Sequence, residues 1–196
     1  MIRLLINLFK SNRHYQYLYC LQQNLKIVDQ ILIVLEDKIK LPQSGKIIIK
    51  HINHRPTFKE LFQIANNITA SNDINIISNA DIYFDETIKL TNKITKNTCF
   101  TLTRHDFKND KFILPQVPAG TQDTWVFRGQ INIPPQSNFM MGYYGCDHRI
   151  AYELNAVGYN VINPCLSIKT YHIHVGRKQE PPTIKGQYKF VPPCSL

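Results

Sequence analysis

The sequence predicts an α/β protein in which a mixed, mainly parallel sheet is flanked by helices. Short apolar runs alternate with helical patterns through the first half of the chain, as they do in βαβ units. After residue 85 the predicted strands follow one another more closely. The chain has 196 residues, of which 43% are hydrophobic and 19% charged, so it is long enough to bury the core of a single unit and its composition excludes a disordered or fibrous class.

The first half predicts four strands and two helices. Apolar runs at 2–8, 31–36, 46–50 and 74–78 are expected to be strands, and the mixed segment 11–25 is expected to be helical. Thr57 and Glu60 have the spacing of a capping box and begin the second helix, which has an apolar face. Asp85 is expected to cap a further helix, because Glu86 follows it.

The second half predicts strands at 99–103, 111–114 and 124–127, a helix at 147–156, and strands at 159–162 and 167–173. The composition changes after Gly176, where prolines become frequent. We therefore expect one domain over residues 1–177 and an irregular, proline-rich tail over residues 178–196 that docks on it.

The charge and the cysteines restrict the partners and the compartment. A net charge of +9 and a pI of about 9.3 favour an anionic ligand or an acidic surface. Five cysteines without a CxxC pair argue against a disulfide framework, so we expect a reducing, cytoplasmic setting. Residues 1–9 are apolar, but Arg3 interrupts them and Lys10 follows, so they are too short for a membrane span.

The most informative segment is 75–85, where an apolar run ends abruptly in carboxylates. Ligands of open α/β sheets bind at the carboxyl ends of the strands. Asp81 at such an edge is suited to hold Mg²⁺ or Mn²⁺ against a phosphate, since these ions take oxygen ligands and commonly keep substrate phosphates among them. The alternative is that Asn79 and Asp81 form an Asx turn after the strand.

Three segments in this order resemble the GT-A fold glycosyltransferases. Residues 55–58 open a helix ahead of the strand that ends at Asp81, as in the nucleotide-sugar half of that family, and residues 142–149 resemble the acceptor-side Gly-Glu-Asp segment of its inverting members. Residues 171–174 are similar to a late segment that supplies a histidine ligand. The resemblance implies a GT-A-like domain with a Rossmann-like donor-nucleotide half at 1–85 and an acceptor half at 86–177.

The resemblance implies a divalent cation, Mn²⁺ or Mg²⁺. Asp81 matches the second acid of the Asp-x-Asp motif, whereas Asn79 replaces the first, so the cation could be bound more weakly or be optional. Asn79 keeps an amide that can meet a ribose hydroxyl. His172 and His174 lie two apart on a predicted strand and leave the same face; His174 is the one matched to the family ligand. The alternative is a structural or surface histidine pair.

Asp147 matches the general base of inverting transferases, which removes the proton of the acceptor hydroxyl. Gly142 and Gly145 would let the backbone approach a sugar closely, while Cys146 replaces the usual Glu of this segment. The alternative is that Asp147 is simply the N-cap of the helix that follows it. Both roles are compatible.

The remaining candidates would contact donor or acceptor. Arg55 is matched to an arginine near the nucleotide, and Arg104 is a candidate for the donor-sugar pocket, although each could instead lie in an ordinary turn. Asp123 and Trp125 could form an acceptor platform of a carboxylate and an aromatic face, against which stands the usual place of a lone tryptophan in the core. Two further acceptor candidates come from the segment that contains the base: Tyr144 and Arg149.

The function expected from the sequence is transfer of a sugar from a nucleoside diphosphate sugar to a glycan or glycosylated acceptor, with inversion and metal assistance. The first alternative is a nucleotidyltransferase that acts on a sugar phosphate. The second is a basic nucleic-acid-binding protein, which the charge permits. Because no zinc finger, helix-turn-helix or RNA-binding aromatic signature is found, we expect no nucleic acid partner.

Overall fold

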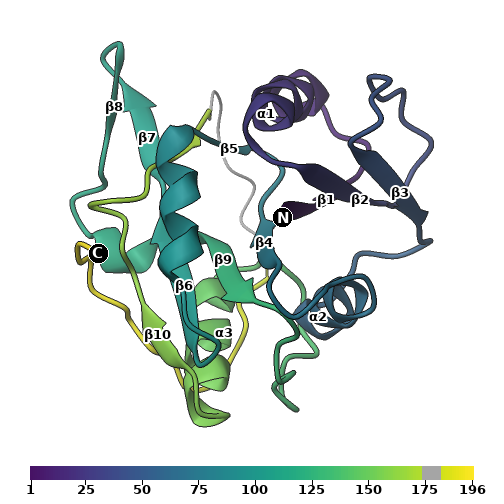
Figure 1. Cartoon of the computed structure of the whole chain (residues 1–196). Helices are drawn as coiled ribbons and strands as arrows, with labels where there is room; N and C mark the ends of the chain where they lie inside the picture. Colours follow the sequence, from purple (N-terminus) through teal and green to yellow (C-terminus); the bar gives the residue numbers. More distant parts are fainter. Residues whose placement is uncertain (174–181) are drawn as a thin grey trace.

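The computed structural model describes residues 1–173 and 182–196 (Figure 1). Within these residues the strands form one sheet of seven strands and one of four. In chain order the elements are β1 (Ile2–Leu8), α1 (His14–Ile27), β2 (Gln30–Leu35), β3 (Ile47–His51), α2 (Phe58–Asn66), β4 (Ile74–Ser78), β5 (Ile82–Phe84), the 3₁₀ helix η1 (Glu86–Lys93), β6 (Thr98–Thr103), β7 (His105–Lys108), β8 (Lys111–Ile113), the 3₁₀ turn η2 (Pro118–Gly120), β9 (Gln122–Arg128), α3 (Cys146–Ala156), β10 (Asn160–Ile162) and β11 (Thr170–His172).

The large sheet has the strand order β10-β6-β9-β4-β1-β2-β3. β1 pairs in parallel with β2 and β4, β2 with β3, and β6 with β10, whereas β9 is antiparallel to both of its neighbours. The sheet is therefore mixed and mainly parallel, which confirms the fold class expected from the sequence.

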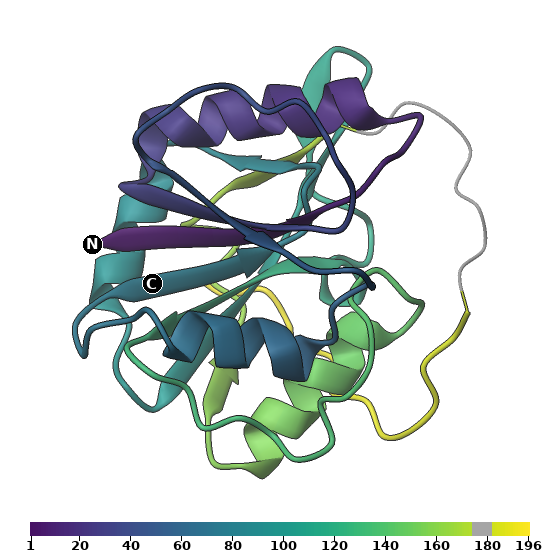
Figure 2. The ribbon, with the colours of Figure 1, turned by 90° about the vertical axis from the view of Figure 1, so that its right-hand side faces the viewer.

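Helices cover both faces of the large sheet, with α1 on one side and α2 and α3 on the other (Figure 2). Alternation along β1 explains the two layers, because successive side chains of a strand point to opposite faces. Leu4 and Ile6 join the core that contains Leu21 of α1, and Leu5 joins the core that contains Phe62 of α2. A strand buried on both faces reads as a continuous apolar run, as β1 does.

The small sheet has the order β5-β11-β7-β8. The sequence does not predict β5 or β7, and β11 is shorter than the strand expected at 167–173. β7 escapes notice because His105, Asp106 and Lys108 give it no apolar alternation. The small sheet nevertheless matters for the site, since its strands bring Asp106 and His172 together.

The helix ends are those that local sequence predicts. The Thr57 side chain accepts a hydrogen bond from the Glu60 backbone N–H, and the Glu60 carboxylate accepts one from the Thr57 N–H, so the capping box is confirmed. Asp85 caps η1 by accepting from the Thr87 N–H at 2.9 Å, as expected. Asp85 directly follows β5, so this cap marks the change from strand to helix.

Residues 182–196 run along α3 and β10. The Lys189 N–H donates to the His148 carbonyl, the Cys194 N–H donates to the Asn163 carbonyl, and Val191 is buried. All five cysteines are free, and four of them are buried. In the part of the chain that the structure describes, no helix is both long and apolar enough to cross a bilayer.

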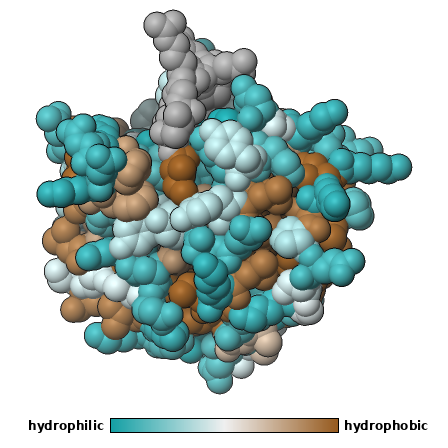
Figure 3. Space-filling model, turned by 90° about the horizontal axis from the view of Figure 1, so that it is seen from above, coloured by the Kyte–Doolittle hydropathy of each residue, from teal (hydrophilic) through white to brown (hydrophobic). Residues whose placement is uncertain are grey.

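The outer edge of the large sheet is β3, whose Ile48 and Ile49 side chains are exposed. On the face seen from above, hydrophobic areas are interrupted by hydrophilic side chains (Figure 3). The surface is therefore of mixed character on this side.

Candidate active site

The candidate site lies at the edge of the large sheet where β1, β2, β4 and β6 end. These strands run in the same direction, so the segments that follow them meet at one edge. β9 runs the opposite way and begins there, which brings Asp123 to the same edge. The chain thus delivers polar residues from six or more distant segments to one place.

Asp81 and Asp106 lie on either side of His172. The His172 Nε2 is 3.2 Å from Asp81 Oδ2, and its Nδ1 is 2.8 Å from Asp106 Oδ1. The imidazole is almost fully buried, with 5% of its side chain exposed, and the two carboxylates are largely buried. A carboxylate on each ring nitrogen fixes the orientation of the ring.

A second group of contacts continues from Asp106. Arg104 donates from Nε to Asp106 Oδ1 at 2.9 Å and from Nη1 to Asp123 Oδ2 at 2.6 Å. The Asn79 amide donates to Asp123 Oδ1 at 2.5 Å. At the other end, Arg13 Nη2 donates to Asp81 Oδ2 at 2.7 Å. We call this continuous set the charged network; it consists of Arg13, Asp81, His172, Asp106, Arg104, Asp123 and Asn79.

The ionisation of the charged network follows from these contacts. Burial opposes the charge of Asp81, but His172 and Arg13 outweigh it and hold its pKa well below the ordinary value. Burial likewise opposes the charge of Asp106, and His172 and Arg104 lower its pKa. Burial alone would lower the pKa of His172, yet its hydrogen bonds to Asp106 and Asp81 raise it. The carboxylates are thus ionised at neutral pH.

Arg55 lies beyond the ends of β2 and β3. Its Nε donates to Glu36 Oε1 at 2.7 Å, and its guanidinium carbon is 3.8 Å from the centre of the Phe9 ring. Phe9 and Glu36 directly follow β1 and β2. Arg55 is therefore at the strand-end edge, as a nucleotide contact requires, in a stacked arrangement that suits a planar guanidinium.

Asp147 occupies the first turn of α3, and its side chain is 17% exposed. The expectation that it is the N-cap is wrong, because the N-cap is Gly145 in a left-handed conformation with φ of 76°. Burial raises the pKa of Asp147, His148 lowers it, and the Asp123 carboxylate raises it further. Asp147 is thus a carboxylate near the charged network whose affinity for a proton is increased.

Solved structures of two glycosyltransferases are among those similar to this chain in fold. GalNAc-T7 with UDP, GalNAc and Mn²⁺ has a TM-score of 0.55 and 9% identity, covering 88% of this chain and 43% of that chain. The catalytic domain of Drosophila β1,4-galactosyltransferase 7 in complex with xylobiose has a TM-score of 0.53 and 10% identity, covering 89% of this chain and 71% of that one. No protein-family model and no curated protein matches the sequence.

The chain has a GT-A-like glycosyltransferase fold. It spans 43% of the length of the GalNAc-T7 chain. At 9% and 10% identity these likenesses describe the fold, and the chemistry has to be argued from the residues of this chain.

Within the GT-A-like fold, several predicted site residues meet and others do not. Asn79, Asp81, Arg104 and Asp123 belong to the charged network. At this edge the Asp81 side chain is only 14% exposed and contacts both Arg13 and His172. His174 lies outside the described residues, so its assignment as a ligand stays a prediction.

Trp125 is not an acceptor platform. It is 1% exposed, and its ring packs edge-on against Phe58 at 4.8 Å between centroids. Inward-facing positions of β9 join the core on the α2 side, which explains the burial. The core alternative is therefore correct for this residue.

Tyr144 and Arg149 stay apart from the charged network. Tyr144 is 43% exposed, and its backbone pairs with Thr183 of the tail. Arg149 donates to Glu153 one turn later, at 2.5 Å, and its guanidinium packs against Gly186. Gly145 also meets the tail instead of leaving room for a sugar, since a Cβ there would lie 2.9 Å from the Tyr188 hydroxyl.

Sequence reasoning missed Arg13 and Glu36 and gave Asp106 no role of its own. Arg13 follows β1 closely and Glu36 follows β2 directly, so the rule that placed Asp81 could have found both. Asp106 lies in β7, which has no apolar pattern, and no local signal distinguishes it.

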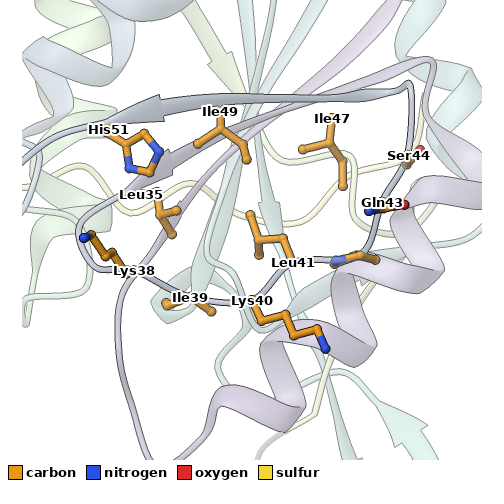
Figure 4. Close-up of a pocket in the computed structure, with 11 residues that line it drawn as sticks. Leu35, Lys38, Ile39, Lys40, Leu41, Gln43, Ser44, Ile47, Ile49 and His51 are labelled. Carbon is orange, nitrogen blue, oxygen red and sulfur yellow. The ribbon is translucent and has the colours of Figure 1, made fainter.

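A cavity of about 660 Å³ lies away from the charged network, between the segment 38–44 and the edge strand β3 (Figure 4). Apolar side chains of Leu41, Ile47 and Ile49 point into it, and Lys38 and His51 stand at one end. None of the network residues lines this cavity. It is therefore not the site that the strand ends create.

Asp81 and His172 are side chains of the types that coordinate a divalent cation. Asp81 Oδ2 and His172 Nε2 face each other, and the second ring nitrogen of His172 is held by the Asp106 carboxylate, which is the usual support of a metal-binding histidine. Over residues 1–173 and 182–196, no group of three or more His, Cys, Asp or Glu side chains is gathered closely enough to hold a metal. Asp81 and His172 would thus need oxygen ligands from a substrate or water.

Proposed function

We propose that this chain transfers a sugar from a nucleoside diphosphate sugar to a glycan or glycosylated acceptor, with inversion at the anomeric carbon. One observation carries the proposal: a GT-A-like sheet edge combines the Asp81–His172–Asp106 group with Asp147, a carboxylate of raised pKa. The Asp81–His172–Asp106 group supplies acid and imidazole side chains for a metal-bound diphosphate, and Asp147 supplies a base.

Asp81 and His172 would hold Mn²⁺ or Mg²⁺, with Asp106 orienting the imidazole. When bound, such a cation neutralises the negative charge that develops on the departing nucleoside diphosphate. The Mn²⁺ in the GalNAc-T7 structure supports the choice of metal, and the UDP there supports a UDP-sugar as the first donor to test.

Asp147 would act as the base. As the acceptor oxygen attacks the anomeric carbon, the bond from that carbon to the diphosphate oxygen breaks, and the hydroxyl proton passes to the Asp147 carboxylate. The Nδ1 atom of His148 lies 3.5 Å from Asp147 Oδ1. A single displacement needs one base and inverts the configuration; no enzyme nucleophile is required.

Arg55 and Arg104 would contact the donor. Arg55 carries its guanidinium on the Phe9 ring beside the strand ends, where a nucleotide would lie. Arg104 is only 13% exposed and is neutralised by Asp106 and Asp123, so we assign it to holding the donor-sugar pocket in shape. Asp123 accepts hydrogen bonds from Asn79 and Arg104, and we assign it to a contact with the transferred sugar.

The binding step is tested with Asp81→Ala, and Asp73→Ala is the matched control. Asp73 also pairs with an arginine, Arg3 at 3.3 Å, but at the opposite end of the sheet. Titration of UDP with Mn²⁺ by calorimetry should give weaker binding for Asp81→Ala only. Equal affinities in the wild type and both variants would remove Asp81 from the site.

The reaction is tested with a panel of radiolabelled nucleotide sugars and glycan acceptors. Transfer of the label to the acceptor supports the proposal. Release of diphosphate from a nucleoside triphosphate in the presence of a sugar phosphate would instead identify a nucleotidyltransferase. Salt-sensitive binding of RNA or DNA without either reaction would identify the nucleic-acid-binding alternative.

A further inference from the structure

Two donors meet the same oxygen of Asp81. Arg13 Nη2 lies 2.7 Å from Oδ2, and His172 Nε2 lies 3.2 Å from the same atom. Asp81 is the residue assigned above to the divalent cation, and the guanidinium already neutralises its charge. A cation that coordinates Oδ2 on the side of Arg13 must therefore displace a hydrogen-bonded, positively charged group.

Arg13 is held in this place by its own neighbours. Its Nε donates to Gln16 Oε1 at 2.6 Å, and its guanidinium carbon lies 5.8 Å from the centre of the Tyr17 ring. Gln16 is 1% exposed, so its amide is fixed, and Arg13 itself is the residue that precedes α1. A side chain with these supports returns to the carboxylate whenever the carboxylate is vacant.

We infer that Arg13 is a built-in competitor of the divalent cation at Asp81 and sets a low intrinsic metal affinity. The inference rests on the proposed function only in taking Asp81 as the metal ligand. Two cations cannot share one oxygen without repelling each other, and the guanidinium is the one that is covalently present at all times. Asn79 adds to the effect, because an amide in place of a second acid brings no charge to favour the metal.

The experiment measures metal binding alone. MnCl₂ is titrated by calorimetry into the wild type and Arg13→Gln, without nucleotide. We expect Arg13→Gln to bind Mn²⁺ about 10- to 100-fold more tightly, the range that corresponds to one charge-assisted hydrogen bond. Arg128→Gln is the matched control, since Arg128 donates to backbone carbonyls of Asn72, Asn92 and Ile94 at the far end of β9. It should leave Mn²⁺ binding unchanged.

A double variant shows whether the gain acts through Asp81. Arg13→Gln combined with Asp81→Asn should lose the increase, because the carboxylate for which Arg13 and the cation compete is gone. A gain that persists in the double variant would overturn the inference. So would unchanged or weaker Mn²⁺ binding in Arg13→Gln, or an equal increase in Arg128→Gln, which would reflect net charge alone.

Arg13→Lys serves if Arg13→Gln fails to fold. An ammonium keeps the charge but lacks the fork that reaches both Asp81 and Gln16, so we expect a smaller increase in Mn²⁺ affinity. No increase would again contradict the inference. If Mn²⁺ binding rises as expected but no nucleotide sugar is turned over, the proposed function fails while the competition between Arg13 and the metal stands.

Discussion

Asp147 has a raised pKa although it lies at the beginning of a helix, where the helix dipole favours a negative charge. Burial and the neighbouring Asp123 account for the raised value. An ionised carboxylate in such surroundings lowers the stability of the folded protein, and the same surroundings make the carboxylate a stronger base. That combination is typical of functional sites, which are optimised for chemistry rather than for stability.

We predict that Asp147→Asn lowers turnover by about 10²- to 10⁴-fold, the usual contribution of a general base. The midpoint of thermal unfolding should stay the same or rise at neutral pH, because the variant removes a partly desolvated charge. Initial rates and calorimetric melting of the two proteins check this. Unchanged turnover would refute the base assignment, and unfolding would show that the carboxylate is mainly structural.

The pH dependence of kcat/KM should report the same carboxylate. Asp147 acts as a base only when ionised, so the rate falls as the pH drops through its pKa, which lies above the ordinary 3.8. Asp81 and Asp106 have lowered pKa values and remain ionised over that range. Rates measured from pH 4 upward should therefore show an acidic limb that is absent from the residual rate of Asp147→Asn.

The sequence predicted the residues of this site unevenly. Asp81 was found because an apolar run ends there, and Asn79 and Arg104 follow strands in the same way. Arg13 lies 68 residues from Asp81, and Asp106 lies 66 residues from His172. Contacts over such separations are created by strand order, which periodicity does not determine. Trp125 was misassigned for a different reason: β9 is buried on both faces, which composition alone does not show.

Among the elements, the N-terminal end of α3 joins the site to the tail. Gly145 has a φ of 76° and faces Tyr188, while Gly142 has a φ of 88° and no atom close to the position of a Cβ. Gly145 is therefore needed both for its backbone conformation and for the close approach of Tyr188. Gly142 is needed for its backbone conformation only. From the sequence we expected both glycines to let the backbone approach a sugar, whereas the close approach at Gly145 is to Tyr188.

Gly142→Ala and Gly145→Ala separate these two requirements. A left-handed conformation costs a non-glycine residue about 1–2 kcal/mol, so both variants should lose at least that much free energy of unfolding in urea. Gly145→Ala should lose more, because its Cβ would meet the Tyr188 ring. Combining Gly145→Ala with Tyr188→Ala should remove this extra loss. Equal losses in the two single variants would contradict the proposed contact.

Helices and strands with a clear pattern of apolar residues were predicted well from the sequence, whereas short polar strands were not. β1, β2, β4 and α2 are apolar runs or capped amphipathic segments. β5 and β7 have three and four residues, too few for a period to be recognised, and β11 is limited to Thr170–His172 of the strand expected at 167–173. They form because neighbouring strands pair with them, which is a tertiary effect.

The whole molecule consists of two hydrophobic cores on either side of one sheet, and Trp125 belongs to the core beneath α2 and α3. The site lies at the sheet edge, outside both cores. Changes in the core on the α2 and α3 side should therefore alter stability first and the chemistry only as the strand ends move.

We predict that Trp125→Ala lowers the free energy of unfolding by about 3–5 kcal/mol, the usual cost of a large buried side chain. Trp125→Phe should cost less and leave the KM for the acceptor unchanged, since the ring packs on Phe58. Urea unfolding and acceptor titrations check the two effects. An acceptor KM that rises in stable Trp125→Phe would restore the idea of an acceptor platform.

The small sheet has one further consequence. On β11, His172 faces the charged network while Tyr171 stacks on Tyr83 from the other side, and both belong to a strand of three residues. Because side chains alternate along a strand, a slip of one position would replace the imidazole with a phenol and turn the histidine toward the aromatic side. The site is thus more sensitive to the length of the chain before Thr170 than to most substitutions. A single inserted residue there should remove the imidazole from its place between Asp81 and Asp106 while leaving every residue of the charged network in the sequence.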